Sequence, residues 1–189
     1  MSHIKIFKYI IVIFNLSLIF AVSGCEKTDL SSLGDNITCF AASYSKGVYK
    51  SDNGGISWYP LVIDQDDIYF YSKGLFLDPD HKRLYITTTG NGLFYIDMVK
   101  DILDRITIFK DEDVRSVLFI DTPDSRSKGF DILVGIKEKG VFMYDDKKGE
   151  LEDLDNGLTY RDVNTVLKIT DGILAGTING LFRMDETSN

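Results

Sequence analysis

The sequence has 189 residues, with 21 Lys and Arg against 29 Asp and Glu, a formal net charge of −8 and 44% hydrophobic residues. This length suits about one domain, and the apolar content excludes a disordered chain. The acidic balance argues against nucleic-acid binding, which needs a basic surface to neutralise phosphates. Two cysteines are too few for a disulfide scaffold or a four-thiolate zinc site.

Residues 1–24 have the pattern of a signal peptide. Lys5 and Lys8 give a positive start, and the apolar run 10–22 follows. As a helix, this run would span about 20 Å, which is too short for a bilayer core of about 30 Å. The run therefore has the length of a secretory leader rather than of a membrane anchor.

The leader closes with Val22-Ser23-Gly24-Cys25. This sequence resembles the lipobox of bacterial lipoproteins, in which an aliphatic and two small residues precede a cysteine. The resemblance implies that Cys25 becomes the mature N-terminus and carries a lipid; the alternative is an ordinary signal peptide with a chance cysteine. Residues 25–36 would then form a lipidated tether that anchors the protein to a membrane without spanning it.

Two features next to the lipobox bear on location. Removing residues 1–24 takes away two lysines and leaves a charge of −10, so the lipid rather than surface charge would hold the protein at an anionic membrane. Glu26 stands where some bacteria use Asp for inner-membrane retention. We therefore expect an extracytoplasmic, lipid-anchored protein of the bacterial cell envelope, on the outer membrane or cell surface.

One phrase recurs four times after the tether: Gly, an aliphatic residue, an aromatic residue, two variable positions and Asp. The glycines lie 45, 48 and 40 residues apart. The four copies are Gly47–Asp52, Gly92–Asp97, Gly140–Asp145 and Gly180–Asp185.

Short apolar runs surround each phrase and predict strands. Runs with small residues at their ends precede all four phrases, at residues 40–43, 84–88, 132–136 and 173–177. Alternating runs lie further upstream in three repeats, at 68–77, 114–120 and 163–169, and a last run follows three phrases, at 57–63, 106–109 and weakly 151–154. A helical solenoid has a similar period, but the runs lack a 3.6-residue spacing.

Four strands, here a to d, at a period near 44 residues predict an all-β fold of β-propeller blades. We expect about four blades within residues 37–189, covering 37–63, 66–110, 113–155 and 156–186. Gly47, Gly92, Gly140 and Gly180 would permit the tight turn between strands b and c, where φ is often positive. The recurring Asp would accept hydrogen bonds from the turn that follows strand c.

The segment from Ser51 to Trp58, Ser-Asp-Asn-Gly-Gly-Ile-Ser-Trp, resembles an Asp-box, the BNR repeat of sialidase-like and photosystem assembly-factor-like propellers. Asn53 takes the usual Asp position and still offers a side-chain oxygen. Gly55 would allow the turn, Ser57 fills the Thr/Ser position, and Trp58 would pack under the turn. The resemblance implies a structural hairpin and not an activity.

The last repeat, residues 156–185, is similar to the propeller repeats in periplasmic sensor regions of two-component regulators. The matching features are Asn156-Gly-Leu, the strand 163–169, Asp171-Gly172, a strand ending in Gly176-Thr177, and Gly180-Leu181. The two resemblances together cover about residues 37–185.

Residues for catalysis or metal binding are few. A sialidase needs three arginines, a Tyr-Glu pair and an acidic Asp, and no arginine lies in such a motif; the arginines of the repeats are Arg83, Arg105, Arg115, Arg126, Arg161 and Arg183. His81 is the one histidine after the leader and suits a solvated loop better than a metal site. The cluster Asp64–Asp67 could form a calcium loop, but a solvated loop is favoured. Cys39 is expected to be a buried small hydrophobe, with a reactive thiol as the alternative.

The sequence therefore predicts a lipid-anchored propeller protein that binds a protein or a glycan, with no cofactor and no catalysis. The alternatives are a fragment of a sialidase-like or other glycan-acting enzyme, and the sensor component of a two-component signalling system. About three and a half blades follow the tether, so we also expect a truncated product or an arc completed by self-association. A strained, closed four-bladed ring is the third possibility.

Overall fold

The computed structural model describes residues 9–13, 37–43, 47–61, 71–78, 82–120, 131–146, 148–154, 157–170 and 172–184. The described residues form β-strands joined by turns, with one short 3₁₀ turn at Thr107–Phe109. The chain divides into two compact units, residues 1–75 and residues 76–189. Each unit is described by itself below.

The first unit contains a sheet in the order β1-β2-β3-β4, which is the first blade. Its strands are β1 (Tyr9–Ile13), β2 (Thr38–Ser43), β3 (Gly47–Ser51) and β4 (Tyr59–Pro60). β2, β3 and β4 form an antiparallel meander, whereas β1 pairs with β2 in parallel. β1 lies inside the predicted leader, so a strand occupies part of the run that we treated as a helix. Phe40 and Val48 are buried on this sheet.

The second blade is the sheet β5-β6-β7-β8. β5 (Ser72–Asp78) crosses the boundary between the units, and β6 (Arg83–Thr88), β7 (Leu93–Asp97) and β8 (Ile102–Ile106) belong to the second unit. β6, β7 and β8 pair antiparallel in sequence order. The predicted fourth strand at 106–109 is wrong: the strand lies at Ile102–Ile106, and the predicted residues 107–109 form the 3₁₀ turn.

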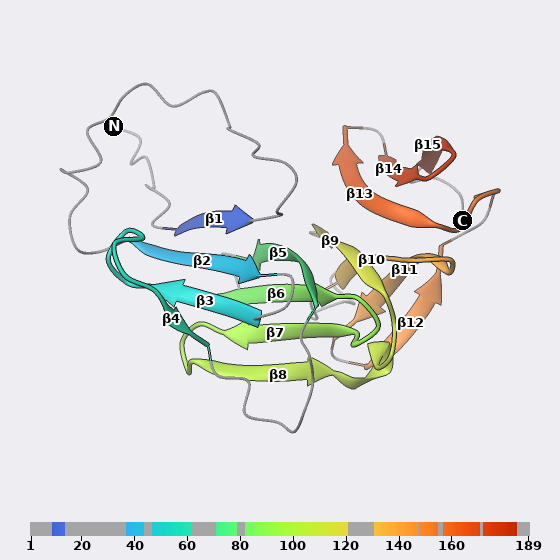
Figure 1. The fold of residues 1–189 in the computed structure, drawn as a ribbon. Helices are drawn as coiled ribbons and strands as arrows, with labels where there is room; N and C mark the ends of the chain where they lie inside the picture. Colours follow the sequence, from blue (N-terminus) through green and yellow to red (C-terminus); the bar gives the residue numbers. More distant parts are fainter. Residues whose placement is uncertain are drawn as a thin grey trace, which may run out of the picture. The chain divides into compact units, whose positions relative to one another are not determined.

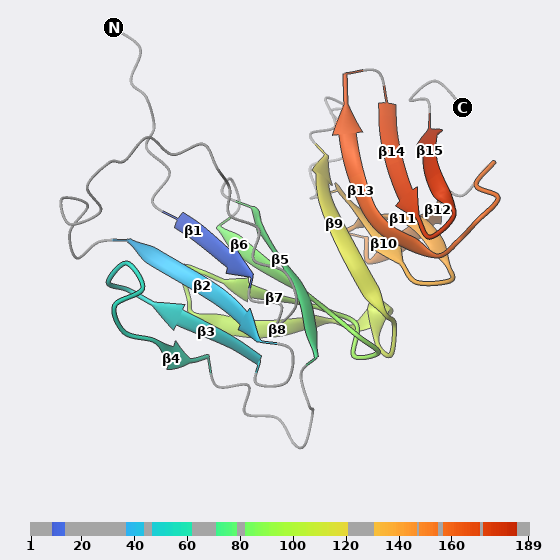
Figure 2. The same cartoon turned by 45° about the horizontal axis from the view of Figure 1, so that its top comes forward.

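The second unit also holds two further sheets, drawn in yellow to red in Figure 1 and Figure 2. The third blade consists of β9 (Val114–Ile120), β10 (Asp131–Ile136), β11 (Gly140–Asp145) and β12 (Glu150–Asp153), paired antiparallel in sequence order. The fourth blade consists of β13 (Val163–Ile169), β14 (Gly172–Thr177) and β15 (Gly180–Met184). Its described residues form three strands.

These meanders confirm the predicted fold class, because the chain is all-β and its successive small sheets are those of a partial β-propeller. Within the described residues no helix is long and apolar enough to cross a membrane.

Two apolar layers hold the blades of the second unit together. The first lies between the second and third blades, and the second between the third and fourth blades. The first layer includes Tyr85, Leu93, Phe109, Val117, Val134 and Tyr144. The second layer includes Leu133, Val141, Val163, Val166 and Ala175. Since side chains alternate along a strand, the third blade contributes one face to each layer.

The second layer is tight at Gly135. A Cβ atom built there would lie 2.9 Å from Val163 Cγ1 of the next blade. A side chain on Gly135 would therefore force the two sheets apart, which explains why a small residue ends this strand.

Candidate functional site

The four repeated glycines all have positive φ. Gly47, Gly92, Gly140 and Gly180 have φ values of 78°, 88°, 107° and 141°. Each begins or precedes strand c, immediately after the b–c turn. At Gly92 an added Cβ would lie 2.3 Å from the carbonyl oxygen of Phe109, so both the dihedral angle and the space require glycine.

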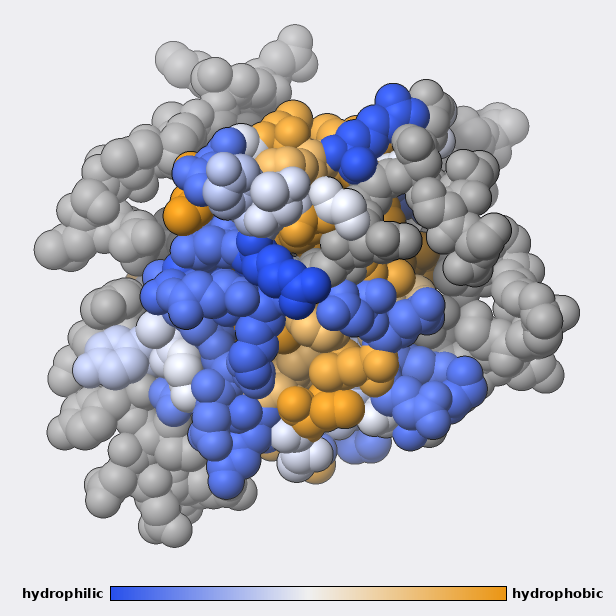
Figure 3. All heavy atoms as spheres, turned by 90° about the vertical axis from the view of Figure 1, so that its right-hand side faces the viewer, coloured by the Kyte–Doolittle hydropathy of each residue, from blue (hydrophilic) through white to orange (hydrophobic). Residues whose placement is uncertain are grey.

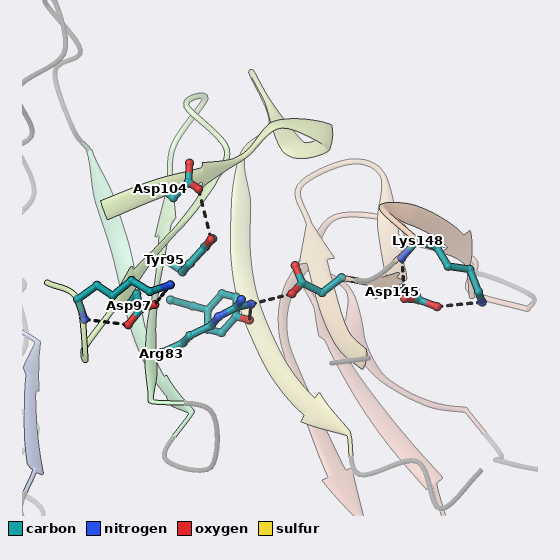
Figure 4. Close-up of polar contacts among 9 residues, drawn as sticks. Arg83, Tyr95, Asp97, Asp104, Asp145 and Lys148 are labelled. Atoms are coloured by element: carbon teal, nitrogen blue, oxygen red, sulfur yellow. Dashed lines mark hydrogen bonds and ion pairs between the residues drawn. The ribbon is translucent and has the colours of Figure 1, made fainter. Parts of the chain in front are cut away.

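Two of the repeated aspartates, Asp97 and Asp145, cap the turn that follows strand c. Asp97 Oδ1 accepts hydrogen bonds from the backbone N–H groups of Val99 and Lys100, at 2.9 and 3.0 Å. Asp145 Oδ1 accepts one from Lys148, at 3.0 Å, and its other oxygen pairs with the ammonium of the same lysine (Figure 4). These backbone bonds lower the pKa of Asp97. The aspartates are thus engaged in turn structure, as the sequence predicts.

The Asp-box forms a hydrogen-bonded hairpin between β3 and β4. Ser51 Oγ is fully buried in the turn and accepts from Gly55 N at 2.8 Å. Asn53 Oδ1 accepts from Ser57 N at 2.9 Å, while its Nδ2 donates to Ser57 Oγ at 2.8 Å. Trp58 Nε1 donates to the carbonyl of Gly55 at 3.0 Å, and the indole lies against this glycine. All five side-chain and glycine positions of the motif therefore serve the turn.

Several predicted features fall elsewhere. The lipid-attachment residue Cys25, the cluster Asp64–Asp67, His81 and Arg126 lie outside the described residues. Cys39 is a free thiol, 4% exposed, as expected for a small hydrophobe. Burial raises its pKa, which lowers the thiolate fraction.

One polar cluster joins the second and third blades at the end where strand b begins. Arg83 starts β6, and its Nη1 lies 2.8 Å from Asp146 Oδ2, just beyond β11. The guanidinium also covers the ring of Tyr95, 4.5 Å from the centroid (Figure 4). Both members of the ion pair are about one-fifth exposed, so this contact is partly shielded from water and links neighbouring sheets.

Tyrosines surround this cluster and stay protonated. Burial raises the pKa of Tyr85 to about 12, and it also raises the pKa of Tyr144 and Tyr95. Arg83 donates to the Tyr85 hydroxyl at 3.5 Å, and the Tyr95 hydroxyl donates to Asp104 at 3.3 Å. The phenols are therefore neutral hydrogen-bonding groups and not nucleophiles at neutral pH.

At the opposite end, the third and fourth blades carry their b–c turns and the segments that lead into strand a. We call this the turn end, defined as residues 110–113, 137–139, 160–164 and 178–179. The turn of each blade is tied to its own strand a: Lys137 N donates to Asp113 O at 2.9 Å, and Ile178 N donates to Asp162 O at 3.2 Å. The tips of the turns are thus anchored to the blades.

Ion pairs link the blades across the turn end. Arg115 Nη1 lies 2.9 Å from Asp162 Oδ1 and also donates to Asn164, so it joins the third blade to the fourth. Lys139 pairs with Glu112, which lies in the segment between the second and third blades. Arg115 and Asp162 are each about one-fifth exposed, and such shielded pairs fix the relative position of the segments they join.

The turn end presents a mixed surface. Glu138 is 73% exposed on its side chain and Ile178 is 62% exposed. Tyr160 is also exposed, and its ring lies 6.1 Å from that of Phe182. A surface that presents charged, apolar and aromatic groups on a backbone fixed by hydrogen bonds and ion pairs is suited to recognising a macromolecule.

The sequence analysis missed the turn end, although a signal was present. The segments Asp113-Val-Arg-Ser-Val-Leu118 and Asp162-Val-Asn-Thr-Val-Leu167 repeat each other. Aligning them places Arg115 and Asn164 at equivalent positions of neighbouring blades, which are the positions that contact each other.

The described residues contain no cluster of three or more His, Cys, Asp or Glu that could hold a metal ion. Arg83 and Arg115 lie at opposite ends of their sheets, and each is bound to an aspartate. The structure therefore does not bring these two arginines together as a carboxylate-binding group.

Comparisons with known proteins place this fold among large propeller proteins. The extracellular domain of a candidate one-component system from B. thetaiotaomicron superposes with a TM-score of 0.60 at 15% identity, over 79% of this chain and 21% of that one. The extracellular domain of a candidate hybrid two-component system from the same organism gives 0.56 at 16%, over 80% and 22%. The Niastella koreensis GH74 enzyme gives 0.59 at 14%, over 81% and 25%.

The chain thus spans about a fifth to a quarter of the length of these solved chains. At these identities the likeness establishes a common fold. No family model and no curated protein sequence matches the chain.

Proposed function

We propose that this chain is the binding part of a lipid-anchored protein of the bacterial cell envelope. Its blades bind a protein or a glycan at the turn end, and it performs no catalysis. The observation that carries the proposal is the turn end itself, where Arg115 and Asp162 hold two blades together beneath exposed side chains such as Glu138, Ile178 and Tyr160.

An extracytoplasmic location is supported by two observations. The first is the leader-like sequence that ends at Cys25. The second is that two of the similar solved structures are extracellular domains. Metabolic labelling with an alkyne fatty acid tests the anchor: we expect label in the wild-type chain and none in Cys25→Ser, which should leave the membrane fraction. Equal labelling of both chains would disprove the role of Cys25.

Binding is tested with a glycan array and with a crosslinkable envelope-protein fraction. Tyr160→Ala and Lys139→Glu alter the turn end, whereas Lys100→Glu alters an exposed lysine beyond strand c at the other end. We expect binding by the wild-type chain and by Lys100→Glu, with loss in the two turn-end variants. Equal loss in all three variants, or no binding by the wild-type chain, would disprove the proposal.

Two other functions have an observation in their favour. The likeness to extracellular domains of bacterial signalling systems favours a sensor component, and crosslinking to a membrane histidine kinase would support it. The likeness to a GH74 enzyme favours a glycan-acting fragment. Release of fluorophore from a panel of fluorogenic glycosides by the purified chain would overturn the non-catalytic proposal.

A further inference from the structure

The fourth blade leaves one sheet face uncovered by other described residues. Val166 and Ala175 point to the third blade and are buried against it. On the other side, Leu167 is 57% exposed and Leu181 is 67% exposed. We call this side the forward face; it comprises Thr165, Leu167, Ile169, Leu174, Gly176, Leu181 and the charged Arg183. Figure 3 looks toward the side of Figure 1 where β13–β15 lie, and apolar atoms gather there between hydrophilic ones.

The forward face repeats an interface already present in the chain. On the third blade, the face packed against the fourth blade comprises Ser116, Leu118, Ile120, Leu133, Gly135 and Val141. The cross-strand pairs correspond: Leu118 opposite Leu133 matches Leu167 opposite Leu174. Gly135 opposite Val141 likewise matches Gly176 opposite Leu181. One pair differs, because Arg183 stands opposite Leu174 where Met143 stands opposite Leu133.

The equivalent face is fully buried in the third blade. Leu133 and Val141 are 0% exposed, because the fourth blade covers them. Exposed leucines in a contiguous patch mark an interaction surface. β15 is the outermost described strand of this sheet, and no described strand pairs with its other side. Its open edge is a second feature that favours contact with another chain, because open edges invite pairing.

We propose that the forward face of the fourth blade docks a second copy of this chain. The face by which the fourth blade covers the third has a small residue opposite an aromatic one, Ala175 opposite Phe182. The β2–β3 sheet carries the same pair, Ala41 opposite Tyr49. A second copy therefore supplies a surface of matching chemistry. This inference goes beyond the proposed function, because it does not depend on any ligand of the turn end.

The test measures the particle mass of the full chain by light scattering after size exclusion. We expect a mass of two chains for the wild type. Leu167→Asp combined with Leu181→Asp places two charges on the forward face, at side chains that are exposed in the structure, and should give the mass of one chain. Val99→Asp combined with Ile102→Asp is the matched control, because it places two charges at exposed apolar positions beyond strand c and in strand d of the second blade.

We expect the forward-face variant to weaken self-association at least tenfold and the control to leave it unchanged. Circular dichroism confirms that both variants are folded. A wild-type chain that stays a single copy at high concentration overturns the proposal, whether or not the variant folds. An assembly that persists in the forward-face variant also overturns it, since the contact would then lie elsewhere, for example in the apolar leader.

Discussion

Replacement of Gly92 by alanine should destabilise the second unit, because glycine is required there both by the backbone dihedral angle and by the space available. Gly92 has φ of 88°, and an added Cβ would lie 2.3 Å from Phe109 O and 2.9 Å from Phe109 C. A left-handed alanine costs about 1–2 kcal/mol, and forcing a packed segment aside costs about 1–3 kcal/mol more. The expected loss is about 3 kcal/mol.

Gly90 provides a matched control two residues away. It also has positive φ, 73°, but nothing lies within 4 Å of an added Cβ. Gly90→Ala should therefore cost about 1 kcal/mol, from the dihedral angle alone. At about 2–4 °C per kcal/mol for a chain of this size, thermal melts followed by circular dichroism should show a drop of about 6–12 °C for Gly92→Ala and about 2–4 °C for Gly90→Ala. Equal drops would refute the argument that the close approach to Phe109 requires glycine.

Three further predictions follow from buried or hydrogen-bonded groups. Burial raises the pKa of Tyr85 from about 10 in the unfolded chain to about 12, so its contribution is complete below pH 10 and is lost as pH rises from 10 to 12. Urea titrations over this window should show falling stability, by up to about 3 kcal/mol for this group, and Tyr85→Phe should flatten the decline; an unchanged slope would assign it to other groups. Asn53→Ala removes the acceptor for Ser57 N and should cost about 1 kcal/mol, whereas Asn53→Asp keeps the acceptor and should cost less, as measured by urea unfolding with Trp58 fluorescence. Gly135→Ala should cost about 1–3 kcal/mol of stability by overpacking. Val163→Ala should recover part of this loss in a double-mutant cycle, because the added methyl contacts Val163 Cγ1. Additive effects of the two substitutions would show that the two side chains do not clash.

The inner strands of the blades could be predicted from the sequence because at least one face of each is packed. The predicted runs 114–120 and 163–169 coincide with β9 and β13, and 84–88 misses β6 by one residue. Alternating apolar residues and small residues at strand ends mark such strands. The recurring phrase supplied the register, since the same turn geometry requires glycine in each copy.

The outermost strands were harder to predict because their side chains face water. β8 has the sequence Ile-Leu-Asp-Arg-Ile, and Ile102 at its start is exposed. Edge strands carry charges that reduce unwanted pairing, and these charges remove the apolar alternation. The apolar run at 106–109 reflects Phe109 instead. This residue belongs to the 3₁₀ turn after the strand, and its side chain is buried.

The ion pairs between blades could not be predicted from the sequence, for a different reason. Arg83 and Asp146 are 63 residues apart, and Arg115 and Asp162 are 47 apart. Their contacts depend on how one sheet is set against the next, which local patterns do not encode. Aligning the repeats shows which positions are equivalent, but only the packed layers show which of them meet.

The two ends of the blades are built under different constraints, and this difference bears on where recognition occurs. At the end beyond strand c, Asp97 and Asp145 each accept a hydrogen bond from the backbone N–H three residues further on, so repeated residues serve repeated turns. At the turn end the glycine is constant, but the tips differ: Lys-Glu-Lys at 137–139 and Ile-Asn at 178–179. The tips also differ in length, and Glu138 has a positive φ of 62° of its own, so the glycine alone does not fix the turn. If the turn end binds a ligand, as proposed, this variation between blades would give each tip a different contact with it.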